Sequence, residues 1–228
     1  MKKSLLFLLA TALSVAVSVP AASAAQSRTR ARTGTYQDSK GNSGTFNTST
    51  TRGGGAKQTD TSWTNQNGQT GSRTSNATWN KATQSGAFSS SSTLPGGKTA
   101  SSQGTVTETA PGNYQIAGTH TGVNGQTSSF NLDRTKTETG SSTTGTITGP
   151  KGGVSTVNSN VTRSAGETVK TTDVTGPKGR TDERVVDTKF NPDGSGTRTI
   201  ENTRPDGTTY TRTVDFSAPT PPPAPIKG

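Results

Sequence analysis

The sequence TGPKG occurs at residues 148–152 and again at residues 175–179. Read alone, Gly-Pro-Lys-Gly fits either a collagen triplet or a tight turn between two strands. Collagen requires glycine at every third position over many triplets, whereas here the chain continues as GVSTVNSN or RTDERVVD. Proline presets the bend of a type I turn, and glycine accepts the left-handed position that follows. The motif therefore predicts a hairpin tip, with Lys151 or Lys178 in solvent.

Glycines in similar turn-like clusters recur with a period of about fourteen residues along the whole chain. They are Gly41, Gly54, Gly68, Gly96, Gly112, Gly125, Gly140, Gly152, Gly166, Gly179, Gly194 and Gly207. One tip is missing from this series and is expected near residues 81–86. Two of the tips are Asn-Gly pairs, the strongest short-range hairpin signal, because both residues tolerate positive φ. The series predicts strands between consecutive tips.

Between the tips the residues alternate, as in TTYTRTVDF at residues 208–216. Tyr210, Val214 and Phe216 fall on one face together with Arg212, and a period of two is the signature of a β-strand. Removing a turn of about four residues from the repeat leaves strands of about ten residues, or ~30 Å.

We therefore predict an all-β fold, a repetitive antiparallel meander of about 13 strands built from a ~14-residue strand-plus-turn repeat. The pattern does not decide whether the sheet stays open, folds over on itself or rolls into a barrel. It also does not decide whether part of the chain is disordered. A β-solenoid is the alternative.

The composition predicts a thin core without covalent staples. The chain contains no cysteine, has a formal net charge of +10, and is only 24% hydrophobic. In the first half the apolar face is mostly aromatic, with Phe46, Trp63, Trp79, Phe88, Tyr114 and Phe130. A membrane barrel fits badly, since its lipid-facing positions would need a continuous apolar band.

The chain divides by composition into five segments. Residues 1–24 have the charged start, apolar run and small-residue end of a secretory signal peptide. Residues 25–33 are expected to form a basic disordered arm, and residues 217–228 a Pro-rich tail. Between them lie a Ser/Thr/Asn-rich β-repeat region with aromatics, 34–132, and a Thr/Val-rich charged one, 133–216. The signal peptide predicts an exported protein, whether periplasmic, cell-surface or extracellular.

The sequence offers no group of residues suited to catalysis, to a metal or to a cofactor, and we expect a protein that is not an enzyme. The lone histidine, His120, is expected to be an exposed strand residue. The acids Asp182, Glu183 and Asp187 lie among basic residues such as Arg184, and cross-strand ion pairing explains them better than acid–base chemistry.

These observations favour an exported, non-enzymatic structural or adhesive protein of a bacterial cell envelope or extracellular matrix. One alternative is a glycan- or polyanion-binding module whose candidate contacts are Trp63, Trp79, Arg28, Arg30 and Arg32. A disordered secreted filler is the other alternative. The partners expected are envelope polysaccharide or other polyanions, or further copies of the chain joined through exposed strand edges. We expect no dedicated nucleic-acid partner and no transmembrane span in the mature chain.

Overall fold

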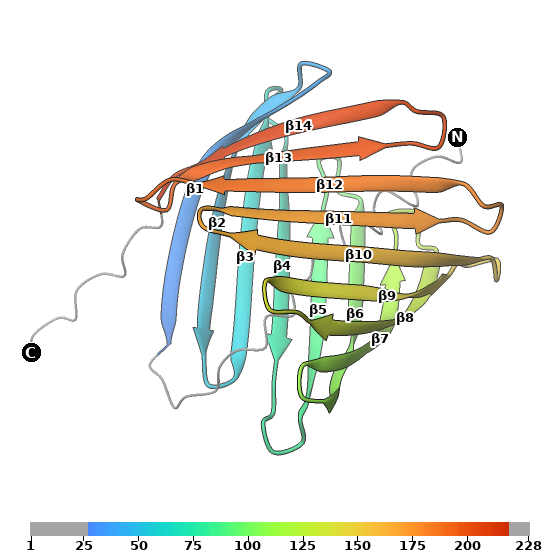
Figure 1. Cartoon of the computed structure of the whole chain (residues 1–228). Helices are drawn as coiled ribbons and strands as arrows, with labels where there is room; N and C mark the ends of the chain where they lie inside the picture. Colours follow the sequence, from blue (N-terminus) through green and yellow to red (C-terminus); the bar gives the residue numbers. More distant parts are fainter. Residues whose placement is uncertain (1–26, 219–228) are drawn as a thin grey trace, which may run out of the picture.

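The computed structural model describes residues 27–218, which form fourteen antiparallel strands closed into one barrel (Figure 1). The strands are β1 (Arg28–Asp38), β2 (Ser43–Gly53), β3 (Ala56–Asn65), β4 (Thr70–Thr78), β5 (Ser85–Thr93), β6 (Thr99–Ala110), β7 (Asn113–Thr121), β8 (Thr127–Lys136), β9 (Gly140–Thr148), β10 (Val154–Ser164), β11 (Glu167–Thr175), β12 (Thr181–Phe190), β13 (Gly196–Thr203) and β14 (Thr209–Phe216). No helix suited to crossing a bilayer occurs in this part of the chain.

Each strand pairs with the next one along the chain, and β1 pairs with β14 to close the barrel. The predicted all-β antiparallel meander is confirmed, with one strand more than expected. The solenoid alternative is wrong, because consecutive strands form antiparallel hairpins. Figure 1 shows β10–β14 passing across the front, while β1–β6 run behind them in another direction. The strands at the front and at the back of the barrel therefore cross at an angle in this view.

Both TGPKG motifs form the predicted hairpin tips. In the β9–β10 loop, the Gly152 N–H donates to the Gly149 carbonyl at 2.9 Å, and the Gly149 N–H donates to the Gly153 carbonyl at 2.8 Å. The β11–β12 loop repeats this pattern at residues 176–180. Gly152 has a φ of 79°, which is the left-handed position that the turn requires.

The wider series of tips is confirmed with one exception. Positive φ occurs at every predicted tip glycine except Gly140, which begins β9 directly after a turn at residues 137–139. The missing tip lies where it was expected, between β4 and β5, and Gln84 has a φ of 49° there. The Asn-Gly turns differ in detail. Gly68 has positive φ and Asn67 does not, because the loop is longer than a two-residue turn, with a bond from the Gly68 N–H to the Asn65 carbonyl.

The core lies against one part of the barrel wall. Alternate residues of each strand face inward, and the buried apolar cluster comes from β4 to β11. Its members are Ala77, Trp79, Phe88, Val106, Tyr114, Ile116, Phe130, Leu132, Ile147, Val157 and Val174. Leu132 is the most buried of them, at 2% exposure. This is the thin, partly aromatic core that the composition predicts.

Inward aromatic rings lie over glycines on the neighbouring strand. Phe88 lies opposite Gly104, and a Cβ at that glycine would fall 2.7 Å from the ring. The same arrangement joins Phe130 to Gly118, Trp63 to Gly71, Phe46 to Gly34 and Phe216 to Gly196. Such glycines let the strand bend toward the ring, which helps a sheet to curve and close. The sequence reading had placed the important glycines only in turns.

The expected basic arm at residues 25–33 is corrected by the structure. Arg28 begins β1, which pairs with β2 from Arg28 to Gln37. Alternation places the arginines on the inner face, while the backbone completes the sheet. The proposed boundary at residue 133 falls inside β8, which continues through it. The expected signal peptide, 1–24, lies outside the described residues, as does the Pro-rich tail beyond residue 218.

Candidate functional site

Strand alternation sorts the cations of this protein to the inside of the barrel. Thirteen of the fourteen lysines and arginines that lie in strands face inward, and only Lys189 faces out. The thirteen are Arg28, Arg30, Arg32, Arg52, Lys57, Arg73, Arg134, Lys136, Arg163, Lys170, Arg184, Arg198 and Arg212. No strand cation but Lys189 is thus available to the outer wall among the described residues.

The acidic residues of the strands show the opposite preference. Eight of eleven face outward: Asp60, Asp133, Glu167, Asp173, Glu183, Asp187, Glu201 and Asp215. Asp38, Glu108 and Asp182 are the three that face inward. The inner face of the strands therefore has thirteen positive and three negative groups, and the outer face has one positive and eight negative groups.

Four inner cations follow one another at intervals of fourteen residues on consecutive strands. They are Lys170 on β11, Arg184 on β12, Arg198 on β13 and Arg212 on β14, and we call them the cationic row. Lys170 pairs with Val186, two residues from Arg184. Arg198 likewise pairs with Val214, two residues from Arg212. Diagonal neighbours of this kind lie ~7–8 Å apart, within the reach of long side chains.

The members of the cationic row are partly buried and repel one another. Burial lowers the pKa of Lys170 to about 8, and the charges of Arg184 and Arg134 act in the same direction. Burial also lowers the pKa of Arg184, with further contributions from Arg212 and Arg198. Within residues 27–218 the four members form no ion pair with a carboxylate. The ion pairs of Lys189, with Glu167 at 3.8 Å and Asp187 at 3.7 Å, lie on the outer wall.

Neutral groups hold the row in place instead of acids. Arg184 Nη1 donates to Asn202 Oδ1 at 3.1 Å, and Arg198 Nε donates to Thr188 Oγ1 at 3.0 Å. The guanidinium of Arg212 lies over the Tyr36 ring, 4.1 Å from its centroid, and its Nε is buried without a hydrogen-bond partner. These contacts orient the cations and leave their positive charge available to an anion.

Other cations line the inner wall on both sides of the cationic row. Burial, followed by the charge of Arg32, lowers the pKa of Arg198. Arg32 in turn lies over the Phe216 ring at 5.2 Å. Arg134 Nη2 donates to Ser141 Oγ at 3.1 Å, and burial lowers its pKa as well. Hydroxyl groups and aromatic rings are thus the recurrent neighbours of the inner cations.

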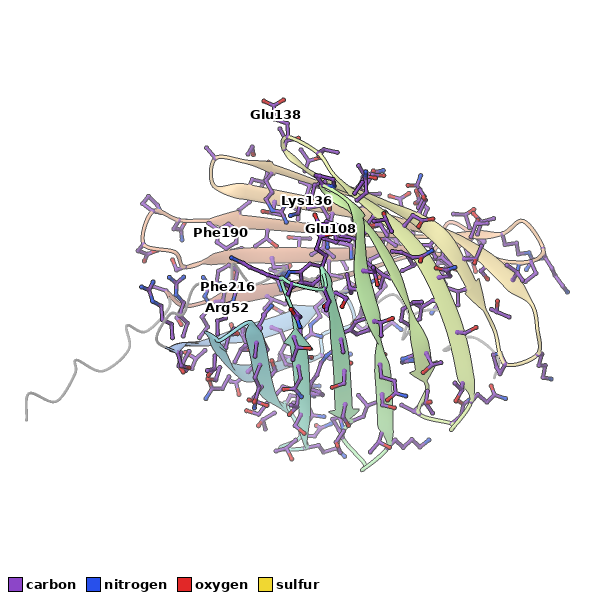
Figure 2. The ribbon with its side chains drawn as sticks, turned by 90° about the horizontal axis from the view of Figure 1, so that it is seen from below. Arg52, Glu108, Lys136, Glu138, Phe190 and Phe216 are labelled. Carbon is purple, nitrogen blue, oxygen red and sulfur yellow. The ribbon has the colours of Figure 1, made fainter. Side chains whose placement is uncertain are left out.

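One end of the barrel combines aromatic rings with charge. Figure 2 shows Arg52, Glu108, Lys136, Phe190 and Phe216 there, and these residues lie at or near the ends of β2, β6, β8, β12 and β14. Phe190 and Phe216 meet edge to face with centroids 5.7 Å apart, and Lys136 lies 5.0 Å over the Tyr114 ring. Phe190 is 37% exposed, so this end offers an apolar border to the cationic interior.

The two tryptophans proposed as a binding platform both face inward. Trp79 is 8% exposed and meets Tyr114 edge to face at 6.1 Å. Trp63 pairs with Gly71, eight residues before Trp79 on the β4 segment. That separation corresponds to ~26 Å along a strand. The rings therefore do not form one continuous platform.

Arg28, Arg30 and Arg32 contribute to the inner face near the tryptophan-bearing strands. They pair in register with Arg52, Thr50 and Thr48 on β2. The structure thus brings the candidate arginines into the same interior as the cationic row, which sequence reasoning missed.

His120 is buried, at 5% exposure, which corrects the expectation of an exposed strand residue. Its place in the alternation of β7 turns it inward, where Nδ1 lies 2.8 Å from Ser102 Oγ. Burial lowers the pKa of His120, which favours the neutral ring. The described residues contain no group of three or more His, Asp or Glu side chains able to hold a metal ion.

The charged cluster near residue 184 is also divided by the sheet. Asp182 and Arg184 face inward, whereas Glu183 and Asp187 face outward. The predicted cross-strand ion pairing is not what the structure shows for these residues. Asp187 pairs with Lys189 two residues along the same strand, and Arg184 donates to the side-chain amide oxygen of Asn202.

Comparison of the chain with protein-family models, with curated proteins and with solved structures gives no match. The site is therefore interpreted from its own geometry. The sequence signal that would have revealed this site is the spacing of its cations. The cationic row recurs every fourteen residues, and each member lies an even number of residues along its strand from a buried residue.

Proposed function

We propose that this protein binds a multiply charged anion, such as a phosphorylated, sulfated or carboxylated ligand, against the inner face of its barrel. The observation that carries the proposal is the separation of charge by strand parity, thirteen cations facing inward and eight acids facing outward.

Packing like charges together on a partly buried surface costs folding free energy, because each cation loses hydration and repels its neighbours. The chain has enough acids to neutralise the row, yet it carries eight of its eleven strand acids on the other side of the sheet. A bound anion would supply the missing negative charge. Guanidinium groups suit this role, because they bind phosphate, sulfate and carboxylate oxygens through paired N–H donors.

This proposal keeps the polyanion-binding alternative and moves its centre from Trp63 and Trp79 to the cationic row, with Arg32 as the link. The role is that of a carrier or receptor rather than an enzyme. The outer wall is rich in threonine, serine and acids, which are costly against hydrocarbon. We therefore propose that the wall faces water in an exported location.

A structural or adhesive role in the envelope is the second candidate, and the outer wall is the feature that favours it. Cross-strand threonine pairs stiffen this surface, as between Thr121 and Thr127 at 2.9 Å and between Thr175 and Thr181 at 2.8 Å. Closure of the barrel pairs both sheet edges, so adhesion would use side chains rather than strand addition. The fourteen paired strands give no support to the disordered filler.

Titration calorimetry of the chain without residues 1–24 tests the proposal, with short polyphosphate and neutral dextran as probes. We expect polyphosphate to bind with an affinity that falls steeply with salt, and dextran not to bind. The double variant Arg184→Gln with Arg198→Gln should weaken polyphosphate at least tenfold. The control Lys189→Gln removes one charge from the outer wall and should leave the affinity within twofold. Equal losses in both variants would show a response to net charge alone.

A further inference from the structure

The hairpin loops differ in charge between the two ends of the barrel. The seven loops that follow odd-numbered strands, from β1–β2 to β13–β14, contain Lys40, Lys98, Lys151, Lys178, Arg180 and Arg204 against a single acid, Asp206. The six loops at the other end contain Lys81, Glu138 and Asp193. One end of the barrel is therefore basic, and the two loops that carry the TGPKG motifs hold half of its cations.

The two TGPKG tips lie against each other. A Cβ built at Gly153 of the β9–β10 loop would fall 3.2 Å from Pro177 Cγ of the β11–β12 loop. Lys151, Lys178 and Arg180 are all exposed on these tips. Figure 1 shows both loops on the same side of the barrel, and we call this group of three cations the basic corner. Val154, directly after the first tip, is 49% exposed and is the most exposed large apolar side chain of the described residues.

The turn itself does not require lysine at these positions. The β12–β13 loop, at residues 191–195, has the same hydrogen bonds, from the Gly194 N–H to the Asn191 carbonyl at 2.9 Å and from the Asn191 N–H to the Ser195 carbonyl at 2.8 Å. There Asp193 stands where Lys151 and Lys178 stand in the TGPKG tips. The identity of this residue is therefore free to serve a contact outside the chain.

We propose that the basic corner docks the barrel on an anionic lipid surface. The tips contain glycine, proline and lysine and have no aromatic ring that would stack on a sugar. An exposed valine beside basic residues suits a bilayer interface, where phosphates gather around the cations and the apolar side chain enters the headgroup boundary. The acidic outer wall is repelled by such a surface, so the barrel stands on its corner and not on its side. This proposal is independent of ligand binding inside the barrel.

Co-sedimentation of the chain without residues 1–24 tests this proposal. The vesicles contain either phosphatidylcholine alone or equal parts of phosphatidylglycerol and phosphatidylcholine. We expect binding to the anionic vesicles only, and release of the protein at high salt. The double variant Lys151→Asp with Lys178→Asp converts both tips to the Pro-Asp-Gly form that the chain already uses, and it should lower the partition coefficient at least tenfold. Val154→Ser should lower it about threefold.

The matched control is Asp193→Lys, which changes charge in the same turn at the opposite end and should leave vesicle binding within twofold. Thermal unfolding of each variant shows that the fold is kept. Equal binding to both vesicle types, or unchanged binding of the Lys151→Asp and Lys178→Asp variant, would overturn the proposal. Binding of soluble dextran sulfate that competes fully and depends on the same lysines would assign the corner to a polyanionic polymer instead, and would also overturn it. Arg184→Gln with Arg198→Gln should not alter vesicle binding, which separates this proposal from the inner site.

Discussion

The barrel has an apolar half and a cationic half that share one backbone plan. From β4 to β11 the inner face carries the aromatic and aliphatic cluster around Leu132, which ends at Val174. From β11 through β14 and on to β1 it carries the cationic row and Arg32. The strands have similar lengths and the same kind of turn in both halves. The comparison teaches that backbone ladders and tips suffice to form the sheet, while the inward side chains decide whether a wall serves stability or binding.

The largest contrast is expected from truncating one core side chain in each half. Leu132→Ala should lower the free energy of unfolding by about 3–4 kcal/mol, because it opens a cavity in the best-buried site. Ile200→Ala, in the half-buried cationic wall, should cost about 1–2 kcal/mol. Urea denaturation measures both values. Equal costs would mean that the cationic half is packed as tightly as the apolar half.

The glycines beneath inward rings should matter in both halves. A Cβ at Gly104 would lie 2.2 Å from the Ala117 carbonyl oxygen, and one at Gly196 would lie 2.0 Å from the Lys189 carbonyl oxygen. Each glycine-to-alanine variant should lower the free energy of unfolding by about 3 kcal/mol, since backbone must move. Thr105→Ala, an outward neighbour on β6, is the control and should change it by less than about 0.5 kcal/mol. An unchanged free energy of unfolding in Gly196→Ala would mean that close packing of a ring against a glycine matters only in the apolar half.

The cationic half should respond to alkaline pH. The folded pKa of Lys170, about 8, lies below its ordinary value of 10.5, so the unfolded chain binds more protons between these values. Stability should therefore rise with pH from about 8 to about 10.5, by about 2–3 kcal/mol. Lys170→Met should remove that rise and should be the more stable protein at pH 7. Denaturation curves of both proteins across this range give the difference, and parallel pH profiles would contradict the expectation.

The smallest effect is expected where β1 pairs with β14 to close the barrel. The Tyr210 hydroxyl donates to the Asp38 carboxylate, which joins β14 to β1. Burial raises the pKa of Asp38, but hydrogen bonds from Tyr210 and Asn42 lower it to about 2. The group thus contributes stability above pH 4 that is lost as the pH falls toward 2. Tyr210→Phe should cost about 1 kcal/mol at neutral pH and reduce that acid loss. Tyr36→Phe is the control, since its hydroxyl makes no hydrogen bond within residues 27–218.

The turn chemistry of this chain made its meander predictable, while barrel closure depended on contacts that no local pattern encodes. The tips at Gly152 and Gly179 follow from the preferences of proline and glycine alone. The pairing of β1 with β14 joins residues 34–38 to residues 212–216, and no sequence pattern in either segment identifies the other as its partner. Inward glycines such as Gly104 were hidden for the same reason, since a strand glycine and its covering ring lie on different segments.

The sequence contains the signal for the cationic site, but the sequence-based prediction did not identify it. The net charge of the chain does not reveal the site, because the structure sorts the charges by strand parity. Asp182 and Glu183 are adjacent in sequence and lie on opposite sides of the wall. The burial of His120 likewise follows from its parity with Ile116 on β7 and not from its threonine neighbours.

Closure of the barrel also sets an order of events during folding. Thirteen of the fourteen strand pairings join neighbours in sequence, so hairpins can form from either end with short loops to close. Only the pairing of β1 with β14 must bring together segments that nearly the whole chain separates, and its loop-closure entropy favours late formation. Before that step the molecule is an open sheet with two unpaired edges. At high protein concentration, β14 of one molecule can then meet β1 of another, and we expect the misfolded product to be a larger ring shared between two chains.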